Sequence, residues 1–157
     1  MTPFRKHLVM LFVLLSIAAA AGQARAAKPA AKPAATAPPA AVLKAFQQAY
    51  PKAVIKRTIH EQREGKPVVE IESVDHGILR DLLYTPEGKL LECEETIPAD
   101  SLPAAVRTAL KSEAPGAKVG RIERIDREGV VTYSINVTAK GKAREIAFDP
   151  SGKLIEP

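Results

Sequence analysis

Residues 39–53 read PAAVLKAFQQAYPKA, and residues 103–117 read PAAVRTALKSEAPGA. The likeness runs without a gap from residues 39–92 to residues 103–156, and about a third of the paired residues are identical. Turn residues fall on turn residues, as in Pro86-Glu87-Gly88-Lys89 and Pro150-Ser151-Gly152-Lys153. A repeat of this length indicates one supersecondary unit present in two copies.

Each copy is predicted to begin with a helix. Apolar residues recur at helical spacing and form one stripe, which includes Val42 and Phe46 in the first copy and Val106 and Leu110 in the second. Pro51 and Pro115 are expected to end the helices, because the residue before a proline is disfavoured in the α region. We expect Asp100 or Ser101 to cap the second helix, with Pro103 in its first turn.

Four antiparallel strands are predicted to follow each helix. The clearest is residues 131–138, where apolar and polar residues alternate strictly. The first strand of each copy, about residues 53–63 and 117–127, alternates poorly, which predicts a bulge or strong twist. The predicted fold class is therefore α+β, with two tandem copies of a unit that contains a helix and a four-stranded antiparallel sheet.

The chain begins with the pattern of an export signal. Arg5-Lys6-His7 is basic, residues 8–21 are almost wholly apolar, and Ala24-Arg25-Ala26 is the small-x-small pattern that signal peptidase cuts. The apolar run of about 14 residues is shorter than the ~20 that span a bilayer. We expect cleavage after Ala26, no stable membrane anchor afterwards, and a periplasmic or secreted protein; a retained anchor is the alternative.

The domain organisation follows from these patterns: signal peptide 1–26, Ala/Pro/Lys-rich linker 27–38, repeat 1 at 39–100 and repeat 2 at 101–157. Outside the signal and the two linker lysines, 18 basic and 18 acidic residues remain. A nucleic-acid-binding protein needs a basic patch on its folded surface. The neutral balance therefore argues against nucleic acid as a partner.

Residues that could carry chemistry are sparse. His60 and His76 fall in different strands or turns without metal-ligand spacing, so no metal site, cofactor or catalytic residue is predicted. Glu92-Cys93-Glu94-Glu95 is the densest acidic cluster, and we interpret it as a solvated strand end. Cys93 is the single cysteine and is expected to be buried or inert, with an intermolecular disulfide as the alternative.

The sequence resembles the PepSY-like, beta-lactamase-inhibitor-like family of exported bacterial proteins. The resemblance rests on turn and core motifs of both copies, of which those in the second copy are Leu102-Pro103-Ala104-Ala105-Val106, Ala114-Pro115-Gly116-Ala117, Tyr133-Ser134-Ile135-Asn136-Val137 and Phe148-Asp149-Pro150-Ser151-Gly152-Lys153-Leu154. The first copy departs from the pattern at Pro67 and Val69. The resemblance implies an extracytoplasmic, non-catalytic module, related in shape to proteins that inhibit enzymes through a sheet surface.

Two hypotheses for the function remain open. The first is a binding module that inhibits or regulates an envelope or extracellular protein through the sheet face not covered by the helices. The second is a periplasmic small-ligand or metal-binding protein, or an enzyme, with a site assembled only in three dimensions. We favour the first, because a sheet face is sufficient for recognition. The candidate partner surface contains Glu70, Glu72, Leu79, Asp81, Leu83, Thr132, Ser134 and Asn136.

The two copies are predicted to differ in charge. Residues 39–100 contain 8 basic and 11 acidic side chains, whereas residues 101–157 contain 10 basic and 7 acidic side chains. The partner surface is therefore expected to be acidic on the side of the first copy. Such a charge would set the orientation and rate of association more than the affinity.

Overall fold

The computed structural model describes residues 37–155. The predicted signal peptide, most of the linker and the last two residues lie outside this range. The described chain runs through α1 (Ala40–Ala49), β1 (Val54–Arg63), β2 (Lys66–Asp75), β3 (Ile78–Tyr84) and β4 (Leu90–Thr96), then through the 3-10 helix η1 (Ala99–Ser101). It continues through α2 (Ala104–Glu113), β5 (Lys118–Arg127), β6 (Val130–Ala139), β7 (Lys142–Phe148) and β8 (Leu154–Ile155).

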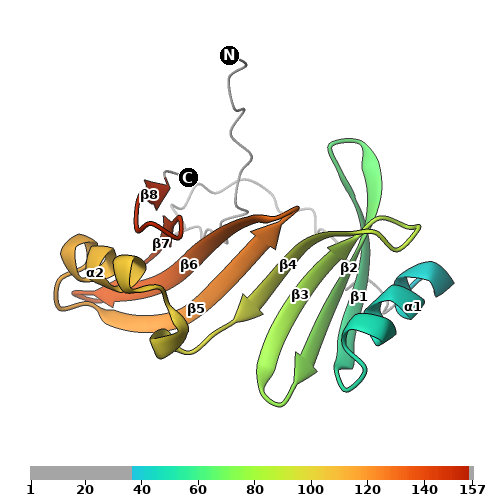
Figure 1. The fold of residues 1–157 in the computed structure, drawn as a ribbon, viewed down its shortest axis with the longest axis horizontal. Helices are drawn as coiled ribbons and strands as arrows, with labels where there is room; N and C mark the ends of the chain where they lie inside the picture. The colour runs from blue at the N-terminus through green and yellow to red at the C-terminus, as the bar shows by residue number, and fades with distance from the viewer. Residues whose placement is uncertain (1–36, 156–157) are drawn as a thin grey trace, which may run out of the picture. The chain divides into compact units, whose positions relative to one another are not determined.

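The eight strands form one antiparallel sheet in the order of the sequence (Figure 1). The predicted α+β class and the order of elements in each copy agree with the structure. The structure does not contain two separate four-stranded sheets, however, because β4 of the first copy pairs with β5 of the second, from Glu92–Arg127 to Thr96–Glu123. An unpaired strand edge exposes N–H and C=O groups, and the pairing of the two copies satisfies these groups along this edge.

Both helices lie against the same face of the sheet (Figure 1). Val42 and Phe46 of α1 pack on Val69, Ile71 and Leu82, and α2 packs in the same way on residues that include Tyr133, Ile135 and Phe148. The helices therefore cover the face that carries Val69, Ile71, Tyr133 and Ile135. Within the described residues, neither helix is long and apolar enough to cross a bilayer.

The helices end where the prolines predict, but the N-terminus of α2 differs from the prediction. Tyr50 and Ala114, which precede the prolines, leave the helical conformation as predicted. The predicted cap at Asp100 or Ser101 is wrong, because Pro103 is the N-cap residue of α2 and makes no side-chain cap. Leu102 is extended, so Asp100 and Ser101 remain in η1. Arg107 instead donates hydrogen bonds to the carbonyls of Asp100 and Leu102.

The irregular first strands are confirmed as well. The register of β1 against β2 shifts between Ile55 and Arg57, and the register of β5 against β6 shifts between Val119 and Ile122. Equivalent places in the two repeats therefore carry a bulge, which increases the local twist of the sheet.

The tight turns before β4 and β8 are held against the helices. Gly88 and Gly152 have φ values of 89° and 84°, in the region that favours glycine. A Cβ atom on Gly152 would lie 2.6 Å from the carbonyl oxygen of Ala105, and one on Gly88 would lie 2.7 Å from the carbonyl oxygen of Ala41. Each turn therefore fits against the first turn of its helix only without a side chain.

Gly152→Ala is expected to lower the free energy of unfolding by about 2–4 kcal/mol, because backbone strain at positive φ adds to a clash with another backbone segment. Gly141→Ala is the matched control, since Gly141 also has positive φ (75°) but a Cβ atom there would meet nothing within 4 Å. Urea unfolding of both variants measures the difference. Equal destabilisation of the two variants would show that close packing at Gly152 contributes nothing.

Candidate functional site

The eight residues of the predicted partner surface share the sheet face opposite the helices, which we call the open face. The register pairs Glu70 with Leu83 and Glu72 with Asp81, and Leu79 follows by alternation. In repeat 2, Thr132 and Ser134 of β6 pair with Ile125 and Glu123 of β5, and Asn136 follows Ser134 by alternation. The structure thus brings the eight residues onto one face. That this face binds a partner stays a prediction.

The exposure of the two predicted surface leucines differs from the expectation. Leu79 is 45% exposed, but Leu83 is only 6% exposed. Leu83 lies between Glu70 and Glu92 in the row of paired residues. The guanidinium group of Arg63 lies within ion-pair distance of both carboxylates, at 3.8 and 3.7 Å. The Arg63 side chain therefore bridges across Leu83, so Leu83 lies on the predicted face but, unlike Leu79, is not exposed there.

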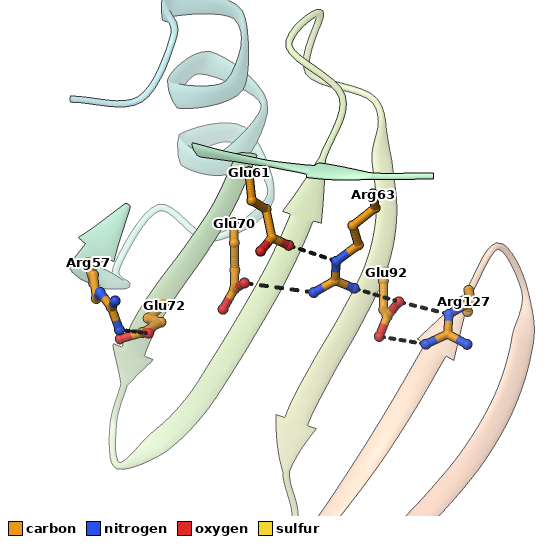
Figure 2. Close-up of polar contacts among 7 residues, drawn as sticks. All are labelled: Arg57, Glu61, Arg63, Glu70, Glu72, Glu92 and Arg127. Atoms are coloured by element: carbon orange, nitrogen blue, oxygen red, sulfur yellow. Dashed lines mark hydrogen bonds and ion pairs between the residues drawn. The ribbon is translucent and has the colours of Figure 1, made fainter. Parts of the chain in front are cut away.

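The position of Arg63 shows how far the first hairpin curls over the open face. Arg63 ends β1, whereas Glu92 belongs to β4, and β2 and β3 lie between these strands. Adjacent strands are about 4.8 Å apart, so a flat sheet would separate β1 from β4 by roughly 14 Å. Figure 2 shows the end of β1 crossing in front of the neighbouring strands, with Glu61 and Arg63 projecting from it. The twist of β1 therefore covers part of the open face.

Glu92 is the centre of the ion pairs on the open face. Arg127 of β5 holds it with two hydrogen bonds, of 2.7 Å from Nε and 2.9 Å from Nη2 (Figure 2). The side chain of Glu92 is 7% exposed, against 62% for Arg127. Burial opposes the charge of Glu92, but the hydrogen bonds and charge of Arg127, with smaller contributions from Glu94 and Arg63, together outweigh burial and hold the pKa of Glu92 below its usual value. This pair joins the two repeats.

The interpretation of residues 92–95 as a solvated strand end is therefore wrong. β4 is the fourth strand of the eight-stranded sheet and has paired neighbours on both sides. Glu92 and Glu94 point to the open face, whereas Cys93 and Glu95 point to the helices. The alternation of acids with Cys93 could have indicated a strand. Nothing in the sequence, however, indicates that β5 would pair with the free edge of β4.

Two acids at the middle of the open face have no basic partner in an ion pair among residues 37–155. Asp81 of β3 and Glu94 of β4 pair in register. Burial, followed by the charges of Glu72 and Glu123, raises the pKa of Asp81. Burial, followed by a hydrogen bond with Glu92, raises the pKa of Glu94 to about 8. Burial and then Glu61 also raise the pKa of Glu70.

The face under the helices contains a cavity of about 340 Å³ between the two repeats. Its lining includes Tyr50, Cys93 and Arg124. Cys93 is buried, as predicted, and its Sγ atom lies 3.7 Å from the hydroxyl of Tyr50. Burial raises the pKa of the Cys93 thiol, and the charge of Glu95 raises it further. The thiolate, which is the reactive form, is therefore disfavoured.

The described residues contain no group of three or more His, Cys, Asp and Glu side chains arranged to hold a metal ion. His60 lies in β1 and His76 in the turn between β2 and β3. His76 has positive φ, and its Nδ1 atom lies 2.5 Å from the carboxylate of Asp75, the last residue of β2.

A protein-family model matches the C-terminal part of the chain. The model described as "Putative beta-lactamase-inhibitor-like, PepSY-like" matches residues 80–156. Residues 80–156 form a PepSY-like segment. The predicted resemblance is thus confirmed. The PepSY-like match begins in β3 and continues through repeat 2, so it crosses the junction between the repeats at which Glu92 meets Arg127.

Solved structures share the fold. A "BLIP-like protein" from Bacteroides fragilis NCTC 9343 is 20% identical with a TM-score of 0.60, over 77% of this chain and 85% of that one. A DUF2874 family protein from Bacteroides ovatus ATCC 8483 is 18% identical with a TM-score of 0.61, over 77% and 86% of the chains. A protein from Bacteroides eggerthii DSM 20697, described as one of the "putative periplasmic proteins", is 21% identical with a TM-score of 0.63, over 77% and 88%. No curated protein matches the chain.

Proposed function

We propose that the protein is an exported, non-catalytic binding module that inhibits or regulates another envelope protein. The open face is its contact surface, and its partner presents a basic residue beside an apolar one. The periplasmic description of the structural neighbour from B. eggerthii supports the location, as does the signal pattern of residues 1–26. The inhibitor-like description of the family supports the role.

The observation that carries the proposal is the juxtaposition of Leu79 with Asp81 and Glu94. Leu79 is an exposed apolar side chain, and the two acids next to it have no basic partner in an ion pair among the described residues. An exposed apolar side chain contributes affinity when a partner buries it on binding, and unpaired acids favour a partner of opposite charge. A surface with Lys or Arg next to a leucine or valine would satisfy both features. Each of the two repeats, moreover, contributes strands to this face.

Asp81→Lys is expected to reduce retention of the partner about tenfold, since a like charge would then face the basic residue of the partner. Leu79→Ser is expected to weaken retention without an effect on salt dependence. Glu87→Lys is the control: it makes the same change of charge in the exposed turn after β3. The experiment compares proteins retained by each immobilised variant from envelope extracts, with quantitative mass spectrometry.

The result that would overturn the proposal is equal retention of the same proteins by Asp81→Lys, Leu79→Ser and the control. Circular dichroism of each variant separates lost binding from lost folding. Leu83→Ser is not suitable for this purpose, because Leu83 is buried and its replacement would destabilise the sheet.

A further inference from the structure

The outer edge of β7 is left without a partner strand over most of its length. In repeat 1, β4 pairs with five residues of β3. In repeat 2, the counterpart strand β8 pairs only with Ala147 and Phe148 of β7. Residues 142–146, which we call the β7 edge, therefore have no strand on this side among residues 37–155. Backbone N–H and C=O groups along such an edge can pair with an extended segment of another chain.

Arg144 on the β7 edge lacks the acidic partner that its counterpart in repeat 1 has. The repeat aligns Arg144 with Arg80 of β3. Arg80 pairs in register with Glu95 of β4, and its Nε atom lies 3.0 Å from the carboxylate of Glu95. The side chain of Arg80 is only 11% exposed, whereas Arg144 is exposed. Arg144 donates a hydrogen bond to the backbone carbonyl of Glu113 at the end of α2, but no acid pairs with it among the described residues.

The neighbours of Arg144 specify the rest of a strand that would fit here. Ile146 is buried in the cluster of α2, and its counterpart Leu82 faces Cys93 of β4, a small apolar side chain. Lys142 is exposed and, by alternation, lies on the same side of the strand as Ile146. In an antiparallel pair, the residue opposite Ile146 is followed two positions later by the one opposite Arg144, and four positions later by the one opposite Lys142. Acids at these two later positions would satisfy both cations.

We infer that the β7 edge binds an extended segment of another protein as an additional strand, and that this segment carries an apolar residue followed by acids two and four positions later. The internal pairing of β3 with β4 already contains the first two of these contacts. Backbone hydrogen bonds supply affinity in this mode of binding, and the alternate side chains supply specificity. The β7 edge is separate from Leu79, Asp81 and Glu94, so its occupant is independent of the partner proposed for the open face.

The basic residues that attract an acidic segment also exclude other strands. Two β7 edges that paired with each other would bring Lys142 and Arg144 of both copies together, and like charges across strands are destabilising. A segment without acids would leave both cations without compensation. Specificity often combines such attraction of one partner with repulsion of others. The charge of the β7 edge therefore favours an acidic segment over a second copy of this chain.

The probe for the test is the capped peptide Val-Lys-Glu-Thr-Glu. Its valine faces Ile146, its lysine faces Glu145, and its glutamates face Arg144 and Lys142. NMR follows the backbone amides of the protein as peptide is added. We expect saturable shifts and slower amide exchange at residues 142–146.

Charge-reversed variants test the assignment to Arg144. Arg144→Glu is expected to weaken binding of the peptide about tenfold. Replacement of the first glutamate of the peptide by lysine is expected to restore binding to Arg144→Glu and to weaken binding to the wild type. Lys52→Glu is the matched control, because it makes the same change of charge in the exposed turn after α1, and it is expected to bind as the wild type does. Circular dichroism verifies that each variant is folded.

Peptides with methylated backbone nitrogens test strand addition itself. Only alternate residues of a strand direct their N–H groups toward a given neighbour. Methylation of one alternate set is therefore expected to abolish binding, and methylation of the other set to leave it intact. Equal binding of both methylated peptides would overturn strand addition, as would an absence of shifts at residues 142–146. Equal binding by Arg144→Glu and Lys52→Glu would overturn the recognition of acids, and a dimer of the free protein that is lost in Arg144→Glu would assign the edge to a second copy instead.

Discussion

Arg127→Met is expected to lower the free energy of unfolding by about 2–3 kcal/mol at neutral pH, a large effect for a side chain that is more than half exposed. The reason is its partner: Glu92 is buried and would lose both hydrogen bonds from Arg127. Arg63 remains at 3.7 Å and limits the loss. Chemical denaturation followed by circular dichroism measures the difference.

The effect of Arg127→Met is expected to depend on pH. The pKa of Glu92 is lowered in the folded protein, so the stabilisation is present above the usual pKa of a glutamate and is lost as the pH falls through the folded value. The difference between wild type and variant should therefore shrink below about pH 4. A difference that is constant from neutral to acidic pH would contradict the assignment to the charge of Glu92.

A matched control compares the Glu92–Arg127 pair with an ordinary surface ion pair. Lys89 and Glu128 also join the two repeats at 2.7 Å, but both side chains are more than half exposed. Lys89→Met is expected to change the free energy of unfolding far less than Arg127→Met, because solvent screens both charges. In addition, the double variant Glu92→Gln with Arg127→Met is expected to recover part of the lost stability, because the amide needs no counter-charge.

Residues 39–100 expressed alone are expected to be partly unfolded or to self-associate. A unit of about 60 residues has a marginal core without a disulfide, metal or partner surface. Removal of repeat 2 would also expose the edge of β4 at residues 92–96 and take Arg127 away from Glu92. An exposed strand edge favours pairing with another chain. Circular dichroism and analytical ultracentrifugation, with residues 37–157 as the control, test this expectation.

The structure shows which contacts make the stability of repeat 1 depend on repeat 2. Each helix has its own hydrophobic cluster, one built from repeat 1 and one centred on repeat 2. The repeats are joined by the β4–β5 pairing and by ion pairs across it, such as the one between Glu92 and Arg127. A monomeric repeat 1 with a sharp and reversible melting transition would show that this pairing is dispensable.

The sequence determined the elements whose signals are local. Strict alternation in residues 131–138 placed Tyr133 and Ile135 under a helix, and helical spacing placed Val42 and Val106 in the core. Pro51 and Pro115 marked the helix ends, because steric clash before a proline is a property of neighbouring residues. Alternation also assigned the eight residues of the candidate surface to one face, because successive side chains of a strand point to opposite sides.

The tertiary structure decided what depends on contacts between distant strands. The sequence does not show that β4 would pair with β5, so Glu92 was interpreted as solvated although it is buried. Nor does it show that β1 curls far enough for Arg63 to cover Leu83. Strand pairing and sheet twist accumulate over many residues and bring together groups far apart in the chain. The burial of Glu92 and the covering of Leu83 both follow from such long-range contacts, which local residue patterns do not encode.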